Sequence, residues 1–273
     1  KPIGYMLLFW PCAWGLTLAY DFTSNLNNYF FYLLLFFLGA VLMRSAGCIV
    51  NDIFDKEFDK KVFRTKDRPI ASGQISVKIG TAYVSILCFC ALLVLLNFNT
   101  ITILLALGSM PLAFTYPLMK RLTYWPQLFL GITFNYGLLL GWTSVNGNFN
   151  IIPIILYLGA IFWTLGYDTI YGFQDIKDDE IIGLKSTSIK FKKEPFIFLL
   201  TCYVILFLML VVLGILNNFN IFYYVFSLII GYHLFFYQLK NVNLNIPMNC
   251  LKVFKSNNLL GFLVFLQLLI GKI

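Results

Sequence analysis

Long apolar stretches follow one another along this chain of 273 residues, and short polar segments separate them. A bilayer core of ~30 Å requires about 20 mostly apolar residues in a helix. The stretches that meet this requirement, with edges good to a few residues, are Gly4–Tyr20, Tyr29–Val50, Val77–Leu96, Ile101–Met119, Trp125–Val145, Ile151–Gly172, Phe196–Leu216, Ile221–Leu239 and Asn257–Ile270. The pattern therefore predicts an all-α integral membrane protein with nine transmembrane helices.

The composition agrees with a chain that lies mostly in lipid. Hydrophobic residues make up 60% of it and charged residues 12%, and the mean hydropathy is +0.81. Average globular chains carry about 25% charged residues, so a soluble protein is excluded. The continuous apolar runs favour helices over a β-barrel, whose strands alternate in polarity. No linker divides the sequence, and we expect residues 1–273 to form a single transmembrane domain around one central cavity.

The charged residues fall on alternate connections between the predicted helices. Nearly all Lys and Arg residues lie in Asn51–Ser76, Lys120–Tyr124, Gln174–Pro195 and Lys240–Ser256. The other connections are short and almost uncharged. The positive-inside rule places the basic face on the cytoplasm-equivalent side. The net charge of +8 therefore indicates membrane orientation and an anionic ligand, and no nucleic-acid partner is expected.

Two acidic clusters follow apolar segments on this charged face. In the first, Asn51, Asp55 and Asp59 recur every four residues and form one helical stripe, with Asp52 beside it. In the second, Asp168, Asp175 and Asp179 are expected to share one helical face.

Asp168 precedes the second cluster inside an apolar run, with Tyr171 one turn further along. Ordinary solvated helix ends are the simpler interpretation of one acidic cluster, but an acid within the membrane is costly and usually functional. Two facing stripes of carboxylates suit Mg²⁺, which binds through one or two carboxylates and substrate phosphates. The clusters thus predict a metal–phosphate site.

Basic residues accompany the first cluster and the end of the fourth apolar segment. Arg64, Arg68, Lys120 and Arg121 are candidates to hold diphosphate oxygens, which need fixed cationic donors as well as a metal. Arg44 lies within the second apolar segment. It either points into a polar cavity, where it would clamp a small carboxylate, or extends to the membrane interface. The residues alone do not decide between these two interpretations.

The motifs resemble those of the UbiA superfamily of membrane prenyltransferases. The first matching signature runs from Asn51-Asp52-x-x-Asp55-x-x-x-Asp59 to Arg64-x-x-x-Arg68-Pro69, and the second is Asp168-x-x-Tyr171-x-x-x-Asp175-x-x-Asp178-Asp179. The runs Arg44–Cys48 and Gly183–Ser188 are similar to those of the 4-hydroxybenzoate polyprenyltransferases within this superfamily. The matching motifs cover about a fifth of the chain, and the helix order extends the resemblance to nearly all of it.

The resemblance implies transfer of a polyprenyl group from an allylic diphosphate to the carbon ortho to the hydroxyl of 4-hydroxybenzoate, with Mg²⁺ as cofactor. It assigns the metal–diphosphate role to the two acidic clusters and gives Arg44 the acceptor carboxylate. Asp168, Asp175 and Tyr171 are the candidates that orient the phenol or accept its ring proton, and the sequence does not choose among them.

The resemblance also implies a compartment and partners. We expect ubiquinone biosynthesis in the mitochondrial inner membrane, with the charged face toward the matrix, or a bacterial plasma membrane as the alternative. The polyprenyl diphosphate, 4-hydroxybenzoate and the lipid bilayer are the expected partners, and association with other ubiquinone-biosynthesis enzymes is compatible with them. Alternative functions are prenyl transfer to homogentisate, dihydroxynaphthoate or haem, and ion-coupled transport.

Overall fold

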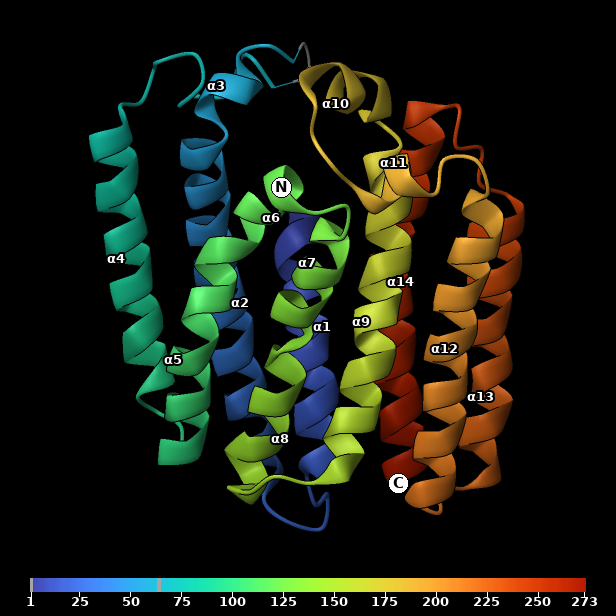
Figure 1. Cartoon of the computed structure of the whole chain (residues 1–273). Helices are drawn as coiled ribbons and strands as arrows, with labels where there is room; N and C mark the ends of the chain where they lie inside the picture. The colour runs from blue at the N-terminus through green and yellow to red at the C-terminus, as the bar shows by residue number, and fades with distance from the viewer. Residues whose placement is uncertain (1, 63–64) are drawn as a thin grey trace.

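The chain folds into a bundle of long helices with several short helices at one end (Figure 1). The structure is a computed structural model that describes residues 2–62 and 65–273, with side chains from residue 4 onward, and these residues contain no β-strand. The long helices are α1 (Pro2–Ala19), α2 (Leu26–Phe54), α4 (Val77–Leu95), α5 (Thr100–Thr115), α7 (Pro126–Asn135), α8 (Gly137–Asn146), α9 (Ile151–Gly172), α12 (Pro195–Leu216), α13 (Ile221–Gly231) and α14 (Pro247–Lys272).

The all-helical membrane fold predicted from the sequence is confirmed. Eight helical passes within the described ranges are long and apolar enough to cross a bilayer, and the shorter apolar helix α1 corresponds to the remaining predicted segment. Three of the passes are composite, because α7 continues into α8, α5 continues into η1 (Tyr116–Leu118) and α6 (Met119–Leu122), and α13 continues into the π-helix η2 (Tyr232–Lys240).

Two boundaries of the membrane passes differ from the predicted ones by more than three residues. Helix α2 continues beyond Val50 to Phe54, so the first acidic cluster begins inside a helix. Helix α14 begins at Pro247, ten residues before the predicted start, although residues 240–256 were expected to form a connection. Its first turns carry Lys and Asn residues and still bury Cys250 and Val253 against the bundle. A hydropathy pattern misses such a helix end because only one of its faces is apolar.

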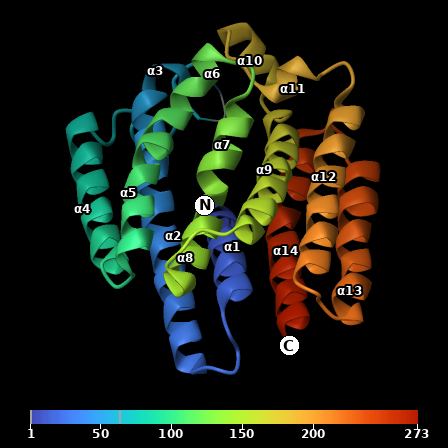
Figure 2. The same ribbon diagram turned by 60° about the horizontal axis from the view of Figure 1, so that its bottom comes forward.

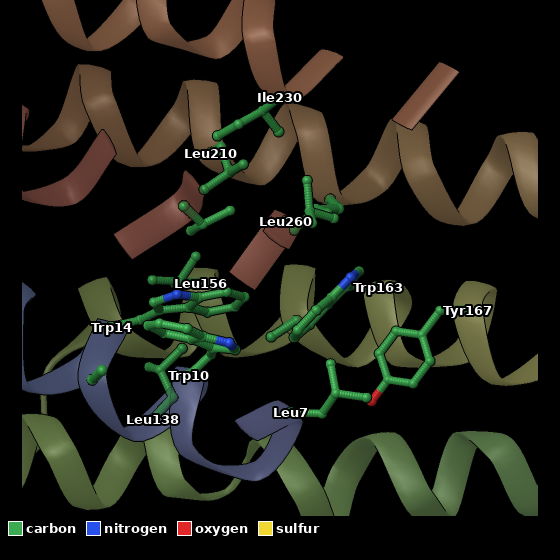
Figure 3. Packing of buried hydrophobic residues seen from close by; sticks show 14 of the residues in the cluster. Leu7, Trp10, Trp14, Leu138, Leu156, Trp163, Tyr167, Leu210, Ile230 and Leu260 are labelled. Atoms are coloured by element: carbon green, nitrogen blue, oxygen red, sulfur yellow. The ribbon is translucent and has the colours of Figure 1, made fainter. Parts of the chain in front are cut away.

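Helix α1 lies in the middle of the bundle and packs against α2, α8 and α14. Its side chains Trp10 and Trp14 belong to the buried core, where the indole rings of Trp14 and Trp163 lie 5.0 Å apart (Figure 3). The Trp14 indole donates a hydrogen bond to the carbonyl oxygen of Gly261 on α14. The first helix of the chain therefore holds together segments from both halves of the sequence.

Glycines let α1 and α8 approach until their backbones touch. A Cβ atom at Gly141 would lie 2.3 Å from the carbonyl oxygen of Cys12 and 2.6 Å from the nitrogen of Leu16. Gly141 and Gly137 are four residues apart on α8, and a Cβ at Gly137 would meet the Cys12 sulfur at 2.4 Å. Small residues at this spacing allow the close van der Waals packing that joins helices in membranes.

Buried polar side chains connect the C-terminal half of the bundle. The Asn257 side chain on α14 accepts hydrogen bonds from the Trp163 indole on α9 and from Gln238 on η2, at 2.7 and 2.9 Å. Gln238 in turn accepts a hydrogen bond from the Tyr203 hydroxyl on α12. In an apolar environment these hydrogen bonds fix how the four elements face one another, because unpaired polar groups are costly there.

The short helices α3 (Lys56–Asp59), α6, α10 (Ile176–Ile182) and α11 (Thr187–Lys190) gather at one end of the bundle, which we call the charged end (Figures 1 and 2). Helix α1 begins toward this end and α14 finishes at the opposite one (Figure 1). The segments predicted to carry the basic residues therefore meet on one face.

We predict that Gly141→Ala lowers the thermal stability of the purified protein in detergent. The added methyl group would collide with the α1 backbone, and overpacking of this kind costs about 1–3 kcal/mol. Gly108→Ala is the matched control, because a Cβ at this exposed helical position meets nothing within 4 Å. It is expected to leave stability unchanged or to raise it slightly. Equal melting temperatures for the two variants would contradict the close α1–α8 packing.

Candidate active site

A polar pocket of about 270 Å³ opens at the charged end of the bundle. Its walls come from the ends of α2, α7 and α9, from α3, α6 and α10, and from the segment before α11. The polar side chains that line it are Asn51, Asp55, Asp59, Thr65, Arg68, Tyr116, Lys120, Gln127, Asp168, Tyr171, Asp175, Asp179, Lys185 and Ser186. The fold thus brings residues of both acidic clusters, more than a hundred positions apart in the sequence, to one cavity.

The first cluster keeps its helical spacing although the helix changes at Asp55. Asp55 ends α2 and begins α3, and its backbone nitrogen donates to the carbonyl oxygen of Asn51. The Asn51 amide donates to Asp55 Oδ2 over 2.9 Å, so both side chains point the same way. Only 2% of Asp55 is exposed. The predicted stripe therefore exists, and its central carboxylate is buried.

Basic residues neutralise these carboxylates in the structure. Lys120 Nζ forms an ion pair with Asp55 Oδ2, which joins α6 to the end of α2. Arg68 Nη1 lies 2.9 Å from Asp52 Oδ1 and 2.9 Å from Asp59 Oδ2, so one guanidinium bridges two acids. Buried charges persist when they are paired and hydrogen-bonded. The residues predicted to bind metal and those predicted to bind diphosphate are therefore partners of one another.

Helix α9 and the turn after it carry the second cluster. Asp168 and Tyr171 lie in the last two turns of α9, and Asp175 is the residue immediately before α10, whose first turns contain Asp179. The Tyr171 ring packs against Phe254 of α14 with 4.4 Å between ring centroids. The predicted arrangement on one helical face is only partly correct, because the chain leaves the helix after Gly172 and a new helix begins at Ile176.

A set of hydrogen bonds fixes the segment between α10 and α11 over the pocket. The backbone nitrogen of Lys185 donates to the Lys120 carbonyl oxygen, and that of Thr187 donates to Gln127 Oε1. The hydroxyls of Thr169 and Thr187 are 2.6 Å apart. Lys120 and Gln127 therefore join this segment to the α6–α7 region, and Thr169 joins it to helix α9.

Arg44 lies in a different cavity from the acids. It lines an apolar cavity of about 350 Å³ between α1, α2, α4, α5, α7 and α8, and its guanidinium lies 5.3 Å from the centre of the Phe134 ring. The Arg44 Nε atom is buried and has no hydrogen-bond partner among the described residues. Its neighbour Tyr116 lines both cavities, so the two spaces meet there.

The structure places the predicted site residues in three groups. Asn51, Asp55, Asp59, Asp168, Tyr171, Asp175, Asp179, Arg68 and Lys120 line the polar pocket, while Arg44 lines the apolar cavity. Asp52 and Arg121 do not line the pocket but contact the lining residues Arg68 and Asp55, and Arg64 lies outside the described residues. Arg121 donates to the Phe54 carbonyl oxygen over 2.6 Å, packs on the Phe58 ring and approaches Asp55 Oδ1 to 3.7 Å. It therefore supports the end of α2.

Sequence reasoning assigned no role to Tyr116, Gln127 and Lys185, which all face the polar pocket. Tyr116 precedes a proline where α5 changes into a 3-10 turn, and this local break is a signal that sequence alone offers. Lys185 lies in the Gly183–Ser188 run, which gave it no individual role. Gln127 gives no such signal, because its position depends on a hydrogen bond with Thr187, 60 residues further along the chain.

Glu57 shows that not every acid of the first cluster belongs to the pocket. It forms an i,i+3 ion pair with Lys60 across 2.8 Å, and 71% of its side chain is exposed. The hydrogen bond from Lys60 lowers the pKa of Glu57, so this carboxylate stays ionised at the surface. Such an exposed pair contributes little to stability.

The donor atoms of the polar pocket fit a Mg²⁺ ion that binds together with phosphate groups. All its acidic side chains offer oxygen ligands, and Asp55 Oδ1 is a buried oxygen without a hydrogen-bond partner in the described part of the chain. No three described His, Cys, Asp or Glu side chains converge on a common point that would hold a metal by itself. Mg²⁺ usually completes its coordination with substrate phosphates and water, so this open arrangement suits it.

The model of the UbiA prenyltransferase family matches residues 8–266, which include both cavities. The chain belongs to this family. Among curated relatives, the mitochondrial 4-hydroxybenzoate polyprenyltransferase of Bos taurus is 43% identical over all of this chain and 73% of its own length. The Drosophila melanogaster protein of the same name is 42% identical over 99% of this chain and 69% of its own length.

A third relative differs in the prenyl group that its name specifies. The 4-hydroxybenzoate geranyltransferase 1 of Lithospermum erythrorhizon is 42% identical over all of this chain and 88% of its own length. Overall identity to this UbiA chain is therefore nearly the same for relatives named after a short prenyl group and after polyprenyl groups.

Solved structures show the same fold at lower sequence identity. The apo structure of a UbiA homologue from Aeropyrum pernix superimposes with a TM-score of 0.76 at 24% identity, covering 98% of this chain and 97% of the other. A homologue from Archaeoglobus fulgidus, solved with geranyl diphosphate (GPP) and Mg²⁺, gives a TM-score of 0.69 at 17% identity, covering 98% and 96%.

We predict that Lys120→Met lowers the free energy of unfolding by about 1–3 kcal/mol, because it leaves the buried Asp55 carboxylate without its main partner. The loss should be smaller in an Asp55→Asn background, and the difference measures the coupling of the pair. Lys192→Met is the control, since Lys192 pairs with Glu180 at the surface, where both side chains are more than a third exposed. Additive losses in the Lys120 and Asp55 variants would show that the buried pair contributes nothing.

Proposed function

We propose that this UbiA protein transfers a polyprenyl group from an allylic polyprenyl diphosphate to the ring carbon of 4-hydroxybenzoate ortho to its hydroxyl, in ubiquinone biosynthesis. The observation that carries the proposal is the meeting of a polar pocket, with acids and bases from distant segments, and an apolar cavity at Tyr116. The names of relatives that align over the whole chain support the acceptor and the reaction.

The polar pocket would hold the diphosphate end of the donor. Mg²⁺, when bound, supplies positive charge that stabilises the diphosphate leaving group. Asn51, Asp52, Asp55 and Asp59 from one side and Asp175 and Asp179 from the other are the proposed ligands, and Asp52 pairs with Arg68.

Cations at the pocket would take the remaining diphosphate oxygens. Arg68 and Lys120 reach it directly, while Arg121 adds positive charge at its edge. We propose the same diphosphate-binding role for Arg64, because of its place in the sequence motif. Lys120 must exchange Asp55 for a phosphate oxygen, and the nearby Arg121 remains beside Asp55 when it does. Fixed cationic donors favour the state in which charge builds up on the departing diphosphate.

The apolar cavity would hold the first part of the prenyl chain. Its walls are aliphatic and aromatic apart from Arg44 and a few hydroxyl groups, and it lies at the depth of the membrane-spanning helices. Such walls exclude water from the allylic carbon after its bond to the diphosphate oxygen breaks. The electrons of the phenol ring then form the new carbon–carbon bond, and the ring loses a proton.

The acceptor would bind where the two cavities meet. Arg44 offers its unpartnered Nε to the carboxylate of 4-hydroxybenzoate, and Tyr116 lies beside the guanidinium. Asp168, Tyr171 and Asp175 line the adjoining pocket wall and are the proposed groups that orient the phenol or accept the proton. The distance between Arg44 and Asn51, about two helical turns or ~10 Å along α2, leaves room for one aromatic ring between carboxylate and diphosphate sites.

We also propose that residues 1–273 form one prenyltransferase domain in the mitochondrial inner membrane, with the charged end toward the matrix. The mitochondrial names of relatives and the basic residues at that end support this orientation. Association with other enzymes that modify the prenylated product is part of the same proposal, because such a product stays in the bilayer.

In isolated membranes, we expect Mg²⁺-dependent formation of prenylated 4-hydroxybenzoate from an allylic polyprenyl diphosphate. EDTA should abolish the product, and Asp55→Ala or Asp175→Ala should lower the rate at least about 100-fold, because each removes a ligand of the charged leaving group. Product is measured by chromatography and mass spectrometry, with homogentisate and dihydroxynaphthoate offered in parallel.

The matched control for these variants is Glu57→Ala, which removes an exposed carboxylate of the same acidic cluster outside the pocket. Its rate should stay within about twofold of the unsubstituted protein. Preference for another acceptor would refute the substrate assignment but keep the metal site. Movement of substrate across the membrane without product would instead support a transporter.

We further expect Arg44→Gln to raise the KM for 4-hydroxybenzoate about 10–100-fold, the effect of removing a hydrogen-bonded charge from a carboxylate. The KM for the prenyl diphosphate should change less than about threefold. Arg44→Lys retains the charge but not the planar pair of donors, so an intermediate KM is expected. Equal increases in both KM values would show that Arg44 does not bind the acceptor.

A further inference from the structure

The apolar cavity runs from the polar pocket toward the opposite end of the bundle. Tyr116 lies at the C-terminal end of α5, and Phe98 lies just before the N-terminal end of the same helix, yet both residues line the cavity. Helix α5 has 16 residues and therefore spans ~24 Å. The space thus crosses much of the membrane depth alongside α5, which Figure 1 shows running from the charged end to its turn with α4.

Two aromatic rings line this cavity at its far end and a third packs against one of them, and we call the three the aromatic floor. Phe98 and Phe36 both line the cavity, with 4.7 Å between their ring centroids. On its other side, Phe98 stacks on Tyr32 at 5.5 Å with an interplanar angle of 20°. Phe36 is almost fully buried. A chain that descends the cavity from Tyr116 therefore meets flat, packed rings.

Hydrogen bonds hold the turn that carries Phe98 in place. The neighbouring Asn99 donates from Nδ2 to the carbonyl oxygens of Thr143 and Ser144 at the end of α8, over 2.7 and 3.1 Å. Its Oδ1 caps α5 by accepting from the nitrogen of Thr102. The hydroxyls of Thr102 and Thr143 lie 3.0 Å apart. These hydrogen bonds inside the bundle therefore fix the position of the turn from which the Phe98 side chain extends.

We propose that the aromatic floor sets the longest prenyl chain that fits inside the protein, with Phe98 as the limiting side chain. The proposal rests on the proposed function, because it places the prenyl chain in the apolar cavity. A chain that reaches the floor must stop, bend or leave sideways into lipid, and its further isoprene units then gain no contact with the protein. Affinity therefore stops rising with donor length once the chain is long enough to reach the floor.

The test is a comparison of donor lengths in lipid nanodiscs. Affinities of geranyl, farnesyl, geranylgeranyl and solanesyl thiodiphosphates, which resist ionisation, are measured with Mg²⁺ by calorimetry. Removal of the floor should raise the affinity of long relative to short donors by about tenfold in Phe98→Ala, the usual size of discrimination by a hydrophobic wall. Phe98→Leu should give a smaller shift in the same direction and preserves packing if the alanine variant folds poorly.

Phe219→Ala is the matched control. Phe219 lies in the α12–α13 turn, packs on Tyr223 with 4.9 Å between ring centroids and does not line the cavity. The ratio of long to short donor affinity should not change in this variant.

An unchanged ratio in both Phe98 variants would overturn the proposal, and so would an equal change in Phe219→Ala. Binding is measured without the acceptor, so the outcome separates the two claims. A shifted ratio with no prenyl transfer to 4-hydroxybenzoate would refute the proposed function and leave the floor standing. Failure of every donor to bind would refute both.

Discussion

The pairing of opposite charges at the end of a membrane bundle is the constraint on which the rest of this structure depends. Asp55 is buried where α2 ends, and Lys120 reaches it from α6, while Arg68 holds Asp52 and Asp59 together. Neither sign of charge would be stable alone at this depth. In the function that we propose, the same groups exchange internal partners for a metal and a diphosphate, which are themselves opposite charges. Stability of the protein and affinity for an ionic ligand would then have a common origin.

The packing of the helices keeps these charged groups next to the apolar cavity. Helix α1 touches α8 through Gly15 and Gly141 and touches α14 through Trp14, so it links the wall of the apolar cavity to the second half of the chain. Tyr116, at the break between α5 and η1, lies where the two cavities join. A substrate that carries an ionic group and a long hydrocarbon chain requires a polar pocket beside an apolar cavity. A soluble fold would offer no lipid into which the chain can extend.

Much of the fold could be predicted because hydrophobic length and charge asymmetry are properties of single segments. The stretch Ile151–Gly172 was predicted with the bounds that α9 has. The start of α14 was missed because a one-sided helix end does not register as an apolar run. In the site, local spacing was enough to find Asn51 and Asp55, whereas Gln127 acquires its place through Thr187. The location of Arg44 in the apolar cavity also depends on neighbouring helices, which no spacing along α2 reveals.

The most direct test of the central claim is whether metal and diphosphate bind to the polar pocket together. Calorimetry on the purified protein would compare Mg²⁺ affinity with and without geranyl thiodiphosphate, and donor affinity with and without Mg²⁺. We expect binding coupling: each ligand should raise the affinity of the other by the same factor of at least about tenfold, since such coupling is reciprocal. Mg²⁺ binding that is equally tight without the diphosphate would contradict it, because the acids would then hold the metal by themselves.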